Sequence, residues 1–163
     1  MHPITHAASR PDHAAIIDAA SGKTVTYGEM DAFANRMARW LRARGVTKGT
    51  RVALLLENRP LYLQLLWSTQ RIGAMLVPIS TRLTAPEIGY IIEDAECALL
   101  LTSAAFADTA KVLADIAPAL EIVDVDDTAF QGEVASQSAE TIEDPSPGQY
   151  MLYSSGTTGR PKG

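Results

Sequence analysis

The 163-residue sequence has a single cysteine, Cys97, so the chain cannot form an internal disulfide. A lone thiol is consistent with a reducing compartment. Because Cys97 precedes the apolar run 98–101, we interpret it as a small buried apolar residue. No apolar run approaches the about 20 residues that a membrane-spanning helix needs. The N-terminus also lacks the basic and apolar regions of a secretory signal, and together these absences predict a cytoplasmic protein.

Basic residues are scarce as well, since 14 Lys and Arg stand against 19 Asp and Glu, for a formal net charge of -5. A nucleic-acid-binding protein needs a basic face that displaces the counterions of the phosphates. The sequence has no basic stripe, so we exclude this class. The histidines His2, His6 and His13 have no carboxylate or cysteine partner at metal-ligand spacing, and we expect them to be exposed to solvent.

Two helices are predicted from their start signals. Thr26 and Glu29 form a capping box, in which each side chain bonds the backbone of the other residue. Apolar residues follow at helical spacing until Gly45, which favours the end of a helix. Thr84 and Glu87 form a second capping box before another apolar stripe. Both segments are therefore expected to be amphipathic helices.

Short apolar runs typical of buried strands begin near residues 52, 75, 98 and 121, with a helical pattern after each of the first three. This alternation predicts an α/β fold with a mainly parallel sheet flanked by helices. We expect four segments: an N-terminal segment 1–24, strand–helix units over 25–125, an exposed acidic connection over 126–148, and a strand with a loop over 149–163.

The last ten residues, 154–163, combine three glycines, four hydroxyl side chains and two cations directly after the predicted strand. Glycines allow successive backbone N–H groups to converge on an anion. Hydroxyls add neutral donors or a magnesium ligand, and Lys162 supplies a point charge that can reach a phosphate. This composition predicts a binding loop for a polyphosphate.

The loop differs from the P-loop of strand-to-helix NTPases, which requires four residues between its first glycine and a Gly-Lys-Ser/Thr ending. Here Gly156 and Gly159 are three positions apart, and glycine follows Lys162. The spacing therefore argues against a kinase-like or GTPase site. A Gly-Thr-Thr-Gly string alone would also suit a surface turn without a ligand.

The whole string Tyr-Ser-Ser-Gly-Thr-Thr-Gly-Arg-Pro-Lys-Gly at residues 153–163 closely resembles the phosphate-binding loop of the adenylate-forming superfamily. That superfamily includes acyl-CoA synthetases, firefly luciferase and the adenylation domains of nonribosomal peptide synthetases. Upstream segments at residues 26–38, 49–53 and 57–60 look like its opening segments. Residues 73–88 resemble the acyl- and aryl-CoA ligase branch in particular.

The resemblance implies the incomplete N-terminal part of an acyl-CoA synthetase-like large domain. It also implies an ATP-dependent enzyme that activates a carboxylic acid as an acyl-adenylate and transfers the acyl group to coenzyme A, with Mg2+ as a further cofactor. The residues that would hold the ATP phosphates are Ser154, Ser155, Gly156, Thr157, Thr158, Gly159 and Lys162. Thr157 would also approach Mg2+, and Arg160 receives no role.

In the family, the catalytic lysine, the adenine pocket and most of the acid pocket follow this loop. The resemblance therefore implies no catalytic residue in this chain, which we expect to be inactive by itself. It also implies that the strand after Lys162 is missing, so that the loop has no return partner and the sheet has an open edge. Three interpretations stay open: part of a CoA ligase, part of an amino-acid or aryl-acid adenylation domain, and a non-enzymatic nucleotide-binding module.

Overall fold

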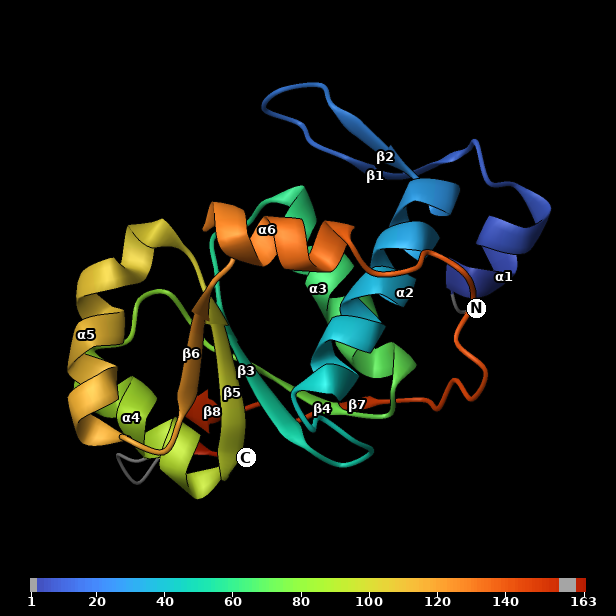
Figure 1. Ribbon diagram of the computed structural model, residues 1–163. Helices are drawn as coiled ribbons and strands as arrows, with labels where there is room; N and C mark the ends of the chain where they lie inside the picture. Colours follow the sequence, from blue (N-terminus) through green and yellow to red (C-terminus); the bar gives the residue numbers. More distant parts are fainter. Residues whose placement is uncertain (1–2, 156–160) are drawn as a thin grey trace.

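The computed structural model describes residues 3–155 and 161–163. Its centre is a sheet of five parallel strands in the order β6-β5-β3-β4-β7 (Figure 1). The strands are β3 (Arg51–Leu55), β4 (Met75–Pro78), β5 (Cys97–Thr102), β6 (Glu121–Asp124) and β7 (Gln149–Tyr150). The prediction of a mainly parallel sheet is confirmed.

Helices cover both faces of this sheet. One face packs against α2 (Tyr27–Ala43), α3 (Pro60–Arg71) and α6 (Thr128–Ala135), and the other against α4 (Ala85–Asp94) and α5 (Ala107–Ile116), which follows the short helix η1 (Ala104–Phe106). Alternate residues of β3 enter the two cores, because successive strand side chains point to opposite faces. Val52 and Leu54 belong to the first core, and Ala53 and Leu55 belong to the second.

Both predicted capping boxes are present. The N–H of Glu29 donates to the hydroxyl of Thr26 at 3.2 Å, and the N–H of Thr26 donates to the Glu29 carboxylate at 2.8 Å. At α4, the N–H and the hydroxyl of Thr84 both donate to one carboxylate oxygen of Glu87 at 2.7 Å, and these bonds lower the pKa of Glu87. Gly45 follows the end of α2 with a φ of 77°, a conformation that favours glycine.

The N-terminal segment contains more structure than its pattern predicted. It forms α1 (Pro3–Ser9) and a hairpin of β1 (Ala14–Ile17) and β2 (Thr24–Thr26), separate from the central sheet. His13 is exposed as expected, and His2 lies outside the described residues. The expectation is wrong for His6, which is half-buried with its ring centroid 4.9 Å from that of Tyr27.

The acidic segment 126–148 is not simply an exposed connection, because its first part forms α6. Phe130 and Val134 are buried, and the Phe130 ring meets Trp40 edge to face at 5.0 Å. Glu133 accepts hydrogen bonds from Trp40 Nε1 at 2.9 Å and from Arg44 at 2.7 Å, and these contacts lower its pKa. Some of the acidic charge therefore ties α6 to α2 rather than facing only solvent.

After α6 the chain runs past α2 and returns to the sheet as β7 (Figure 1). Three side chains of α2 bind this stretch. Asn35 donates to the carbonyl of Ala139 at 3.0 Å, and Arg39 donates to the carbonyls of Ser138 at 3.0 Å and Glu140 at 2.6 Å. Arg42 forms an ion pair with Asp144 at 2.8 Å. The segment between α6 and β7 is therefore bound to α2 at several points.

Gly148 lies where the backbone passes closest to α3. Its N–H donates to the carbonyl of Gln70 at 2.8 Å. A Cβ atom here would lie 2.4 Å from the carbonyl oxygen of Ala74 and 2.6 Å from the Cα of Gln70. These neighbours are backbone atoms, so only glycine fits without moving the strand.

We expect Gly148→Ala to lower the free energy of unfolding by about 1–3 kcal/mol, the usual cost of an overpacked site. Equilibrium urea unfolding measures this change. Gly132→Ala is the matched control, because a Cβ at Gly132 in α6 meets no atom within 4 Å. That control is expected to stabilise the protein by about 0.5–1 kcal/mol. A wild-type unfolding midpoint for Gly148→Ala would contradict the close approach.

Candidate functional site

The glycine-rich segment starts from the edge of the sheet. The N–H of Met151, just after β7, donates to the carbonyl of Leu76 in β4 at 2.9 Å. The next strands, β8 (Ser154–Ser155) and β9 (Pro161–Lys162), pair antiparallel, with Ser154 opposite Lys162. The expectation that the loop lacks a return partner is wrong, because residues 161–162 of the segment itself form the return strand.

The structure places part of the predicted phosphate site. Ser154 is exposed, and the backbones of Ser155 and Lys162 lie in the β8–β9 pair. The other predicted phosphate-binding residues, Gly156, Thr157, Thr158 and Gly159, lie outside the described residues, as does the proposed magnesium contact of Thr157. Over residues 3–155 and 161–163, no group of three or more His, Cys, Asp or Glu side chains is arranged to hold a metal ion.

Tyr153 precedes β8 and packs against the core between the sheet and α4. Its hydroxyl donates to Oδ2 of Asp94, the last residue of α4, at 2.5 Å. Burial and the neighbouring Asp94 carboxylate raise the pKa of Tyr153 well above its ordinary value. This contact leaves no signal in the sequence, because the two residues are 59 positions apart and no local pattern links them.

Comparison with known families agrees with this architecture. Residues 4–163 match the family described as AMP-binding enzyme. The chain belongs to that family. The match includes the whole β8–β9 segment as well as the strand–helix units before it.

Relatives of this AMP-binding chain are longer proteins. The chain is 38% identical to the 3-hydroxybenzoate–CoA/4-hydroxybenzoate–CoA ligase of Thauera aromatica, over 86% of this chain and 29% of that protein. It is 39% identical to surfactin synthase subunit 3 of Bacillus subtilis, over 88% of this chain and 11% of that protein. The N-terminal domain of FACL13 from Mycobacterium tuberculosis superposes with a TM-score of 0.87 and 32% identity, covering 99% of this chain and 42% of that structure. The chain therefore spans less than a third of the length of the ligase that it matches.

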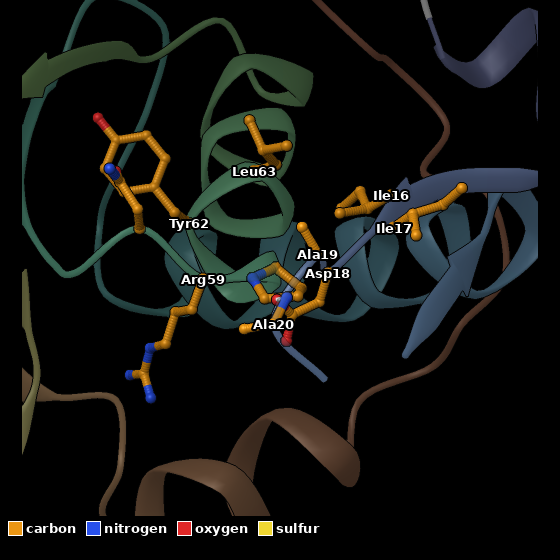
Figure 2. A pocket seen from close by; sticks show the side chains of 10 residues that line it. Ile16, Ile17, Asp18, Ala19, Ala20, Arg59, Tyr62 and Leu63 are labelled. Carbon is orange, nitrogen blue, oxygen red and sulfur yellow. Dashed lines mark hydrogen bonds between the residues drawn. The ribbon is translucent and has the colours of Figure 1, made fainter. Parts of the chain in front are cut away.

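A concave region of the AMP-binding chain lies between the β1–β2 hairpin and the start of α3, with a volume of about 530 Å³ (Figure 2). Ile16, Ile17 and Leu63 give it an apolar lining. Arg59 directs its guanidinium away from these side chains and pairs with Asp126 at 2.8 Å. The cavity therefore offers apolar contacts rather than a cation for phosphate, and it is separate from the β8–β9 segment (Figure 1).

The chain contains one thiol, that of Cys97 at the start of β5, which is only partly accessible. Burial raises its pKa to about 12, although the nearby Arg51 acts in the opposite direction. Among the described helices, none is both long and apolar enough to cross a membrane.

We expect the Cys97 thiol to react slowly with a disulfide reagent at pH 8. The thiolate is the reactive form, and a raised pKa leaves the folded protein with far less of it than an ordinary thiol has. The reaction is expected to be at least about 100-fold slower in the folded than in the urea-unfolded protein, and to accelerate as the pH rises toward 12. Equal rates in the two states would show that burial does not protect Cys97.

Proposed function

We propose that this chain forms the ATP-phosphate-binding part of an enzyme that activates a carboxylic acid and transfers it to coenzyme A. The observation that carries the proposal is the β8–β9 pair, which closes a Gly- and Thr-rich loop at the edge of a parallel sheet in an AMP-binding family chain. Because the chain spans 29% of the hydroxybenzoate ligase that it matches, the activity is proposed for the whole protein.

In the proposed reaction, a carboxylate oxygen of the acid attacks the α-phosphorus of ATP, and pyrophosphate leaves. The thiol of coenzyme A then attacks the acyl carbon, loses its proton and displaces AMP. Negative charge on the departing phosphates needs fixed donors and cations. Backbone N–H groups and hydroxyls of residues 154–159, with the ammonium of Lys162, are the groups that we assign to this task.

Magnesium would reduce the charge of the polyphosphate and favour its departure when bound with ATP. We assign its protein contact to Thr157, because a hydroxyl supplies the oxygen ligand that this cation prefers. We also propose a cytoplasmic location, where ATP and coenzyme A are available.

The decisive experiment measures exchange of labelled pyrophosphate into ATP by the full-length protein, with fatty, aryl and amino acids each tested separately. Exchange that depends on an added acid, followed by acyl-CoA formation when free coenzyme A is supplied, is the expected result. The absence of exchange with every acid class would contradict adenylate formation.

We further expect the 163-residue chain alone to catalyse no such exchange. The family resemblance assigns phosphate contacts to residues of this chain but not the groups that orient the acid toward the α-phosphorus, and orientation accounts for about 7–11 kcal/mol of a barrier. Acid-dependent exchange above a no-protein control would overturn this expectation.

A second candidate is an adenylation domain that loads an amino acid or aryl acid onto a carrier domain. It is supported by the 39% identity to surfactin synthase subunit 3. Transfer of amino acids to a carrier protein, with no acyl-CoA formed, would favour this candidate. The segment 73–88, which resembles the CoA ligase branch, is why we rank it second.

A further inference from the structure

We propose that the hydrogen bond between Tyr153 and Asp94 anchors the phosphate loop to α4, which makes these two side chains positioning residues for ATP. This inference rests on the proposed function. It adds Asp94, a residue that lies outside the glycine-rich segment and 59 positions before Tyr153.

The helix that carries Asp94, α4, is firmly packed against the sheet. The residues Ile88, Ile91 and Ile92 of α4 are each no more than 2% exposed and belong to the core between α4 and the sheet. They fix the helix against β3 and β5, so the carboxylate at its last residue keeps its place. Asp94 itself is exposed, which leaves its oxygens free to accept a bond from a neighbouring segment.

Tyr153 connects α4 to the loop. Its ring packs against the same core, and its hydroxyl reaches Asp94 at 2.5 Å. The next residue, Ser154, pairs with Lys162 across the β8–β9 ladder. Directly opposed residues in an antiparallel pair have Cα atoms about 4.5–5.5 Å apart. A displacement of Tyr153 would therefore be passed to both ends of the loop.

Gly163, the residue after β9, lies against the same Tyr153 ring. A Cβ atom at Gly163 would lie 2.8 Å from Cε2 and Cζ of Tyr153, closer than side chains approach one another. The absence of a side chain allows the backbone to lie against the aromatic ring. The ring thus contacts the residue after β9 and directly precedes β8, so one side chain is joined to both strands.

The hydrogen bond from Tyr153 to Asp94 is expected to be present at neutral pH. The raised pKa of Tyr153 keeps its hydroxyl protonated and able to donate at neutral pH. Cys97 and Tyr90 lie near enough to contribute to that shift, and neither carries a positive charge that would draw the Asp94 carboxylate away.

The test compares Tyr153→Phe, Asp94→Ala and the conservative variant Asp94→Asn in the full-length protein. Acid-dependent pyrophosphate exchange is measured against ATP concentration, beside thermal unfolding. We expect Tyr153→Phe and Asp94→Ala to raise the KM for ATP by about 3- to 10-fold, with kcat and the unfolding temperature little changed. Asp94→Asn keeps an acceptor oxygen and should retain a KM close to wild type.

Glu93→Ala is the matched control, because Glu93 is the neighbouring exposed carboxylate of α4. It should leave the KM unchanged. The double variant Tyr153→Phe with Asp94→Ala should be no worse than either single variant, since both remove the same bond. Unchanged KM values in both single variants, or equal effects from Glu93→Ala, would overturn the anchor.

Hydrogen exchange separates this inference from the proposed function. In the same proteins without ATP, the amides of residues 162–163 should exchange faster in Tyr153→Phe than in wild type, whatever reaction the enzyme catalyses. If the wild type exchanges no pyrophosphate but this acceleration is seen, the adenylation proposal fails and the anchor stands as a structural contact. If the amides exchange at the wild-type rate, the anchor fails.

Discussion

Lys162→Ala in the full-length protein is expected to slow acid-dependent pyrophosphate exchange by about 10- to 150-fold. A hydrogen bond to a charged group is worth about 1.5–3 kcal/mol, and each 1.36 kcal/mol corresponds to a tenfold change in rate. The backbone of Lys162 lies in β9, at the end of the Gly- and Thr-rich loop. The variant should unfold at the wild-type temperature, because a cation for phosphate contributes to binding rather than to the core.

Lys111→Ala is the control for this variant. Lys111 pairs with Asp108 on α5, and its side chain is 77% exposed. Its removal is expected to change neither exchange kinetics nor stability by a measurable amount. A folded Lys162→Ala protein with wild-type kinetics would contradict the assignment of residues 154–163 to the ATP phosphates.

Asp31→Ala should destabilise the protein by about 3–5 kcal/mol, the typical cost of leaving a buried charge without its partner. Arg71 is 4% exposed and donates to Asp31 and to Asn35, each at 2.5 Å. Removing the carboxylate leaves the guanidinium between α2 and α3 with the Asn35 oxygen but no opposite charge. Urea unfolding at equilibrium measures the loss.

Two further variants test the cause of that loss. Asp108→Ala removes the acid of the exposed Lys111 pair and should cost no more than about 1 kcal/mol. Asp31→Leu combined with Arg71→Met should recover much of the stability, because apolar side chains often replace a buried ion pair at little cost. If the double variant is as unstable as Asp31→Ala, the unpaired charge is not the reason for the destabilisation.

Local patterns in the sequence were sufficient to predict the central fold. Two capping boxes, Thr26 with Glu29 and Thr84 with Glu87, each span four residues and mark the starts of α2 and α4. The apolar runs of β3, β4, β5 and β6 can likewise be recognised without knowing a distant partner. The composition of the glycine-rich loop likewise suggests phosphate binding, which stays a prediction.

Features that depend on distant partners could not be predicted in this way. The helix α6 has too few apolar residues to show a clear period, and it is stabilised by contacts of Phe130 and Glu133 with Trp40. The bond from Tyr153 to Asp94 likewise exists only because β7 returns the chain to the α4 side of the sheet. Such contacts are set by tertiary packing, which a single sequence does not display.

The strand order separates β6 and β7, which are consecutive in the sequence but lie at opposite edges of the sheet. With about 4.8 Å between neighbouring strands, the chain must travel about 19 Å across the sheet before β7 can pair. A strand added over such a distance closes a long loop, which is slow. We therefore infer that β3 to β6 assemble first and that β7 joins the sheet last. The β8–β9 pair that follows β7 then belongs to the late-folding part of the molecule, and a nucleotide bound at the proposed phosphate site would stabilise that part selectively.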